Sequence, residues 1–157
     1  MCSSDLAIAW AAGAGTVGST EDSLERETAT LGGFLEALRE GGPTGPGAFL
    51  LASSAGGVHA GSAHPPFDEV TPAHPISAYG DAKLAQERLA ASLLADRCPT
   101  VVARFSNVYG PDQNLAKAQG LISQLALAAV SRQPVNIYVP LQTIRDYVYA
   151  SDAGASR

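Results

Sequence analysis

The chain has 157 residues, a formal net charge of −5 and 46% hydrophobic residues, which suits one domain with a sizeable core. An acidic balance without runs of Lys or Arg argues against nucleic-acid and anionic-membrane partners, because both need a clustered positive surface. No apolar stretch approaches the roughly 20 residues of a bilayer-spanning helix, and no signal peptide is visible. We therefore expect a cytoplasmic protein that binds neither nucleic acid nor membrane.

Cysteine and histidine are too few and too scattered for a structural metal site. Cys2 and Cys98 make neither a disulfide framework nor a four-ligand zinc site. His59, His64 and His74 share no helical ligand spacing, so we expect no bound metal and interpret the three histidines as solvated loop residues.

Short apolar runs alternate with longer amphipathic stretches, the pattern of βαβ units around a parallel sheet. Ser19 and Asp22 have the spacing of a capping box, and Gly41 begins a Gly-Gly-Pro stop, so a helix is expected between them. A loop from about His59 to Ile76 is long enough to be functional. The other expected elements are strands over 6–12, 48–52 and 101–105, helices over 79–95 and 120–132, and closing apolar runs over 135–139 and 147–150.

A glycine-rich turn follows the first predicted strand. Gly13-Ala14-Gly15-Thr16-Val17-Gly18 matches G-x-G-x-x-G, the turn that binds a dinucleotide pyrophosphate. The polar, acidic residues after Gly18 and the lack of an acidic residue at the end of the next strand count against that function. We favour a loop that touches cofactor from another side, and keep a small domain built on its own phosphate loop as an alternative.

Tyr79 and Lys83 lie four residues apart on a predicted helix, so the phenol and the ammonium address the same ligand. A neighbouring ammonium favours phenolate over phenol, which suits Tyr79 to proton transfer. The ends of two predicted strands support a ligand site at this pair. Ser53-Ser54 and the segment that begins at Arg104 both fall at the strand ends where open α/β sheets bind ligands.

Together these segments resemble a family, the NAD-dependent epimerase/dehydratases of nucleotide sugars within the extended short-chain dehydrogenase/reductases. The resemblance implies a Rossmann-like α/β fold, a doubly wound parallel sheet. It is carried by residues 49–58, 75–87, 104–111 and 144–149, in the family's order.

The resemblance implies NAD or NADP as cofactor, a nucleotide sugar as substrate, and a homodimer. Tyr79 would take a proton from a sugar hydroxyl, and Lys83 would support it and bond the nicotinamide ribose. Ser54 would orient the reacting oxygen, with Ser53 as the alternative. The implied cofactor positions are Ala11, Ala12, Gly13, Ser53, Tyr79, Lys83, Phe105 and Ser106, and the implied substrate positions are Ser54, Asn107 and Arg145.

One departure from the family's pattern distinguishes between its possible activities. Ala55-Gly56 stand where sugar-nucleotide dehydratases carry an Asp-Glu pair, and elimination of water needs an acid and a base at neighbouring carbons. We therefore predict an epimerase that works by transient hydride transfer. A reductase or dehydratase of the same family and a non-catalytic NAD(P)-binding sensor stay open as alternatives.

The family's phosphate turn and most of its substrate lobe are not found in these 157 residues. We expect residues 1–157 to be a single incomplete domain that is inactive alone. Residues 1–6 match one reading frame of a sequencing adapter from Cys2 onward, so we expect them to be foreign to the natural protein.

Overall fold

The structure, a computed structural model, describes residues 6–41, 46–115 and 120–155. Residues 1–5, most of the stretch expected to be foreign, lie outside the described part. The chain forms two compact units, one ending at Arg104 and the other beginning at Phe105.

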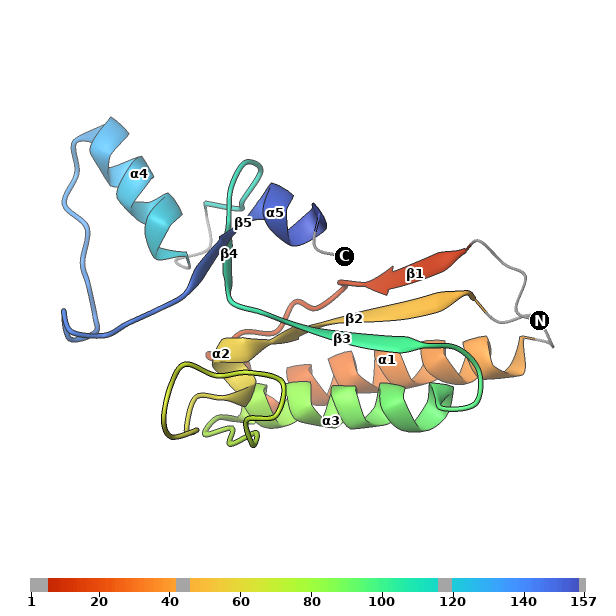
Figure 1. The fold of residues 1–157 in the computed structure, drawn as a ribbon. Helices are drawn as coiled ribbons and strands as arrows, with labels where there is room; N and C mark the ends of the chain where they lie inside the picture. Colours follow the sequence, from red (N-terminus) through yellow and green to blue (C-terminus); the bar gives the residue numbers. More distant parts are fainter. Residues whose placement is uncertain (1–5, 42–45, 116–119, 156–157) are drawn as a thin grey trace. The chain divides into compact units, whose positions relative to one another are not determined.

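A three-stranded sheet in the order β1-β2-β3 forms the first unit, and the long helices α1 and α3 lie side by side against one face of it (Figure 1). β1 runs parallel to β2, with Ala7 opposite Ala48. The elements are β1 (Ala7–Trp10), α1 (Glu21–Glu40), β2 (Ala48–Ser54), α2 (Ala55–Val58), α3 (Ala78–Leu94) and β3 (Thr100–Phe105).

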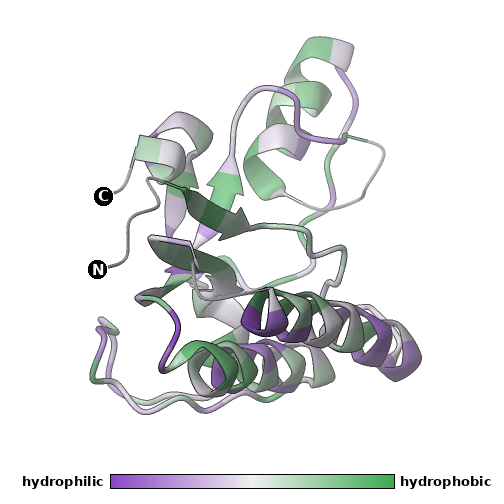
Figure 2. Ribbon diagram, turned by 90° about the vertical axis from the view of Figure 1, so that its right-hand side faces the viewer, coloured by the Kyte–Doolittle hydropathy of each residue, from purple (hydrophilic) through white to green (hydrophobic). Residues whose placement is uncertain are grey.

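The core lies between the sheet and the two long helices. Alternate residues of β2 are buried, so Phe49, Leu51 and Ser53 point into this layer. Leu31 and Leu35 of α1 are fully buried in the same cluster, while hydrophilic residues lie along the outer side of α1 (Figure 2). This pattern of apolar stripes on helix and strand fixes which face of each element points into the core.

The predicted strands and helices of this unit are confirmed, with two differences. The N-cap of α1 is Thr20, whose side chain makes no capping bond. The predicted capping box is wrong because Ser19 Oγ instead accepts a hydrogen bond from the Thr16 amide at 2.9 Å, within the preceding turn. The short helix α2 was not predicted.

The second unit contains a two-stranded parallel sheet and two helices. Asn107 pairs with Tyr147 at the start of the ladder. The predicted helix over 120–132 is confirmed as α4, which is apolar along most of its length and has no buried residue (Figure 2). The predicted apolar run over 135–139 forms no strand. The elements are β4 (Asn107–Tyr109), α4 (Leu121–Ser131), β5 (Tyr147–Tyr149) and α5 (Ala150–Ala155).

Two negative findings hold for the described ranges. No helix there combines the length and apolar character that crossing a membrane requires. Nor do three or more His, Cys, Asp or Glu side chains come together there as a metal site would need.

Candidate active site

The two serines at the end of β2 have different partners because successive side chains point to opposite faces of a strand. Ser53 is buried and donates its hydroxyl hydrogen to the carboxylate of Glu87 on α3. Ser54 caps α2, and its Oγ accepts a hydrogen bond from the Gly57 amide at 3.1 Å. Ser54 therefore keeps its own hydroxyl hydrogen available for a ligand, whereas Ser53 has given its hydrogen to Glu87.

Glycines bring the α2 turn against the start of α3. A Cβ at Gly80 would clash with the carbonyl oxygen of Gly57 and lie 2.9 Å from Pro75 Cβ, so only glycine allows this approach. A Cβ at Gly57 would lie 3.0 Å from Cε1 of Tyr79. The Tyr79 ring thus packs on Gly57, the residue whose amide holds Ser54.

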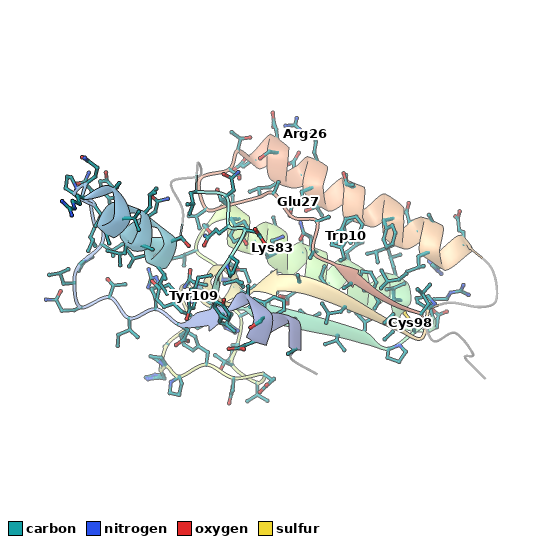
Figure 3. All side chains as sticks on the ribbon, turned by 90° about the horizontal axis from the view of Figure 1, so that it is seen from above. Trp10, Arg26, Glu27, Lys83, Cys98 and Tyr109 are labelled. Atoms are coloured by element: carbon teal, nitrogen blue, oxygen red, sulfur yellow. The ribbon has the colours of Figure 1, made fainter. Side chains whose placement is uncertain are left out.

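Lys83 brings a positive charge to the same place. Its Nζ lies 5.7 Å from the centroid of the Tyr79 ring, a separation at which a cation and an aromatic face attract. The side chain is almost fully buried and forms an ion pair of 2.8 Å with Oε1 of Glu27. A second hydrogen bond, of 3.1 Å, goes to Oε1 of Gln86. Figure 3 shows Glu27 reaching from α1 and Lys83 from α3.

Glu27 also holds the glycine-rich turn. Its Oε2 accepts hydrogen bonds from the amides of Ala14 at 2.9 Å and Gly15 at 2.8 Å. Burial raises the pKa of Glu27, but hydrogen bonds from Lys83, the Gly15 amide and Gln86, together with the charge of Lys83, outweigh it and leave the pKa below its usual value. A phosphate would have to displace this carboxylate from the turn, which supports our preference against a phosphate loop.

Of the cofactor positions predicted on the first strand and its turn, Ala12 and Gly13 lie beside this cluster. A Cβ at Gly13 would lie 3.0 Å from Nζ of Lys83, so the turn approaches the ammonium closely. Ala11 and Ala12 are exposed. Ala12 borders a cavity of about 410 Å³ that Trp10 and Glu27 also line. Their role toward a cofactor stays a prediction.

The remaining predicted positions belong to the second unit. The Nδ2 of Asn107 donates to the Asp146 carbonyl at 2.9 Å, which ties β4 to the segment before β5. Arg145 donates to the Ile144 carbonyl at 3.1 Å. The roles predicted for these two residues, and for Phe105 and Ser106, are not tested by these contacts and stay predictions.

Two groups of polar residues at the site were not predicted from the sequence. Gln86 and Glu87 follow Lys83 at three and four residues, so all three share one helix face, a spacing that was readable in the sequence. Glu27 gave no such signal, because its partners are 12 or more residues away. His59 was predicted to be solvated and this is wrong: it is 5% exposed, because Arg104 and a neighbouring aromatic ring cover it.

The known proteins that this chain is similar to point to one family. The family model described as "NAD dependent epimerase/dehydratase family" matches residues 3–155. A dTDP-L-rhamnose 4-epimerase from Burkholderia thailandensis is 36% identical over 84 residues, 52% of this chain and 23% of that protein. A putative UDP-glucose 4-epimerase from Methanocaldococcus jannaschii is 32% identical over 106 residues, 66% of this chain and 34% of that protein.

Solved structures give the same result for the fold. UDP-glucose 4-epimerase from Thermotoga maritima, crystallised with UDP-glucose, aligns with a TM-score of 0.81 and 25% identity over 93% of this chain and 48% of that one. UDP-glucuronic acid 4-epimerase from Bacillus cereus, in complex with UDP-glucuronic acid and NAD, aligns with a TM-score of 0.67 and 25% identity, covering 80% of this chain and 38% of that one. This chain thus spans about half the length of the Thermotoga enzyme and a smaller share of the other three relatives.

The fold is therefore a partial Rossmann-like α/β sheet, as predicted. The chain belongs to the NAD-dependent epimerase/dehydratase family, among the extended short-chain dehydrogenase/reductases. The family is NAD-dependent, and a solved structure that is 32% identical to this chain carries NAD, so the predicted cofactor is confirmed.

The site fits one end of NAD better than the other. Tyr79 and Lys83 offer the donors that ribose hydroxyls accept, and one of the three ammonium hydrogens of Lys83 remains after the bonds to Glu27 and Gln86. The amides of Ala14 and Gly15 are bonded to Glu27. The nicotinamide-ribose end thus fits the residues around Tyr79, while the glycine-rich turn offers little to the pyrophosphate.

Proposed function

We propose that this chain carries the catalytic centre of an NAD-dependent nucleotide-sugar epimerase. The observation that supports it is the convergence on Gly57: its amide holds Ser54 Oγ, the Tyr79 ring packs on it, and the Lys83 ammonium lies over that ring. A phenol, a hydroxyl with a hydrogen to donate and a nearby cation are the groups that move a proton on and off a sugar hydroxyl.

Each residue has one role in this proposal. Tyr79 takes the proton from the sugar hydroxyl, Ser54 donates a hydrogen bond that orients the reacting oxygen, and Lys83 provides positive charge and a donor for the nicotinamide ribose. NAD supplies a reversible hydride acceptor when it is bound. Tyr79 returns the proton to the same oxygen once the carbon has regained its hydrogen on the opposite face, so the configuration of the carbon is inverted without net oxidation.

The α2 turn favours epimerisation over dehydration. It consists of Ala55–Val58 and has no acidic residue in its first turn. A dehydratase needs an acid and a base at neighbouring carbons, and α2, the turn next to Ser54, supplies neither. Relatives of both kinds occur, since a probable dTDP-glucose 4,6-dehydratase from Sinorhizobium fredii is 34% identical over 87 residues.

The test is Tyr79→Phe in the full-length product of the natural gene, with UDP-glucose and dTDP-glucose as substrates. We expect formation of the 4-epimer to fall by about 10² or more, the usual effect of losing a proton-transfer group. Tyr138→Phe is the matched control because Tyr138 is 89% exposed. Unchanged turnover in Tyr79→Phe would reject the assignment, and loss of water in the natural enzyme would reject epimerisation.

We also propose that residues 1–157 alone bind NAD weakly and turn over no nucleotide sugar. The support is the bonding of the Ala14 and Gly15 amides to Glu27, which takes away the donors that a pyrophosphate needs. Calorimetric titration of the 157-residue chain with NAD checks this. Tight binding that Gly15→Val abolishes would instead favour the alternative of a self-contained phosphate loop.

The homodimer predicted from the resemblance has support in a groove between α1 and α3. This groove, of about 820 Å³, has Leu24, Leu89 and several acidic residues in its lining together with small residues that permit close helix approach. The small residues are Ala29, Gly32, Gly33, Ala78, Ala82 and Ala85. We propose that a second copy of the chain packs its own α1 and α3 here, and that the enzyme works in the cytoplasm.

A further inference from the structure

His59 is a buried histidine with a defined partner on each ring nitrogen. Its Nε2 lies 3.1 Å from Nη1 of Arg104, and its Nδ1 lies 3.3 Å from Oγ of Ser62. The ring stacks on Phe67, with 5.3 Å between centroids. The chemistry of these partners decides which nitrogen carries the hydrogen.

A guanidinium has only donors, so Nε2 of His59 must be the acceptor toward Arg104. Ser62 has a single hydroxyl hydrogen and gives it to the Pro72 carbonyl at 2.8 Å. Its oxygen therefore accepts from Nδ1–H of His59. The two bonds together require a neutral imidazole with its hydrogen on Nδ1.

Arg104 is itself fixed by a carboxylate. Its Nε and Nη2 bind Glu87 with distances of 3.0 and 2.7 Å, a fork-on-carboxylate arrangement. These hydrogen bonds raise the pKa of Arg104 despite its partial burial. Glu87 also accepts the hydroxyl of Ser53, so a continuous chain of bonds links the end of β2 to His59.

The position of His59 in the chain gives this network a consequence for the site. Helix α2 has Ser54 as its N-cap and His59 as its C-cap. Ser54 is held by β2, and His59 is held by Arg104. Both ends of the turn that presents Ser54 are thereby anchored, and the following loop is tied to it by the bond from the His74 amide to the Val58 carbonyl at 2.9 Å.

We propose that His59, as the neutral Nδ1–H tautomer, is a positioning residue for Ser54, and that it acts by anchoring α2 to Arg104 and Glu87. The proposal rests on the proposed function only in giving Ser54 a role toward substrate. The bonding itself is tested without substrate or NAD.

The first experiment is ¹⁵N NMR of the imidazoles in the 157-residue chain at neutral pH, with His59→Gln used to assign the His59 signals. We expect a protonated Nδ1 and an unprotonated Nε2. A hydrogen on Nε2 would overturn the proposal, because Arg104 could not then donate to it. A merely space-filling ring would show a mixture of both tautomers.

The second experiment measures hydrogen exchange of the Gly57 amide, the donor to Ser54, in His59→Leu and His59→Gln. Glutamine has an acceptor oxygen and an NH2 group with two donor hydrogens and is expected to preserve both bonds, so its exchange should stay close to that of the natural chain. Leucine keeps the bulk and loses the bonds, and about tenfold faster exchange is expected, the equivalent of roughly one hydrogen bond. His74→Leu is the control, since His74 is exposed on the same loop.

Amides of β2 serve as the reference for global unfolding. Equal exchange of Gly57 in the Leu and Gln variants would overturn the proposal. If the Leu variant does not fold, the tautomer measurement and the Gln variant still decide. Both measurements are made without substrate or NAD, so their outcomes do not depend on whether Tyr79 is catalytic. A failure of the proposed function is therefore distinguishable from a failure of this proposal.

Discussion

Nζ of Lys83 and Oε1 of Glu27 lie 2.8 Å apart, and the two side chains are only 8% and 11% exposed. The same carboxylate accepts both turn amides on its other oxygen. Glu27 is therefore shared between the glycine-rich turn and the lysine of the site, and its charge state controls both.

The first prediction concerns pH. Because the pKa of Glu27 is lowered on folding, its contribution to stability is complete above the pKa of an unfolded glutamate and is lost as the pH falls through the folded value. Lys83→Met removes a donor and a charge, so the pKa of Glu27 should rise and the acid-side loss of stability should begin at higher pH. Carboxyl ¹³C NMR and thermal unfolding against pH measure both.

The control for that titration is Arg39→Met, which removes a cation from the last turn of α1. It should leave the pKa of Glu27 where it is. A Glu27 titration that is the same in Lys83→Met and in the natural chain would contradict the ion pair.

The second prediction concerns the approach of α2 to α3. Gly80→Ala puts a methyl group against the Gly57 carbonyl and Pro75, and backbone cannot yield as a flexible side chain can. We expect a loss of about 1–3 kcal/mol in the free energy of unfolding, the usual cost of overpacking, together with altered NMR shifts at Ser54 and Tyr79.

Gly154→Ala is the matched control for this substitution, since nothing lies within 4 Å of a Cβ there and the residue does not line the groove between α1 and α3. Because Gly154 is inside α5, alanine should stabilise the chain by up to about 1 kcal/mol. Similar destabilisation by both substitutions would mean that Gly80 is not a close-packing position.

Periodicity was enough to predict the framework. The alternation in β2 and the apolar stripe of α1 that contains Leu31 and Leu35 follow directly from the spacing of apolar residues. The Tyr79 and Lys83 pair was equally readable, because four residues on a helix always share a face. Local rules suffice where the interacting groups are near in sequence.

The electrostatic part of the site could not be predicted in this way. Glu27 and Lys83 are separated by 56 residues, and His59 and Arg104 by 45. Only the packing of α1 beside α3, and the bond between the C-cap of α2 and Arg104 of β3, brings these groups together. The residues next to His59 in the sequence do not indicate that it is buried, because they form a polar loop. This is why the expectation of a solvated His59 was wrong.

The third prediction separates two roles for Asn107. Its amide donates to the Asp146 carbonyl, so Asn107→Ala should speed exchange of backbone amides in β5 by the equivalent of about 1 kcal/mol. Because the residue is exposed, Asn107→Ser, which keeps a donor, is the comparison. Unchanged exchange in both variants would show that the bond from Asn107 to Asp146 does not stabilise β5. The predicted contact with substrate would then be the remaining role for this residue.

The last prediction concerns the groove between α1 and α3. Ala85 is exposed on α3 and lines this groove, so Ala85→Arg places a long charged side chain where a second copy would have to pack. Arginine is a good helix former, and folding should be unaffected. We expect a dimer of the natural full-length protein in analytical ultracentrifugation and a monomer for Ala85→Arg. Ala91→Arg, an exposed position of the same helix outside the groove lining, should remain dimeric. A dimer that persists in Ala85→Arg would show that the chains associate through another surface.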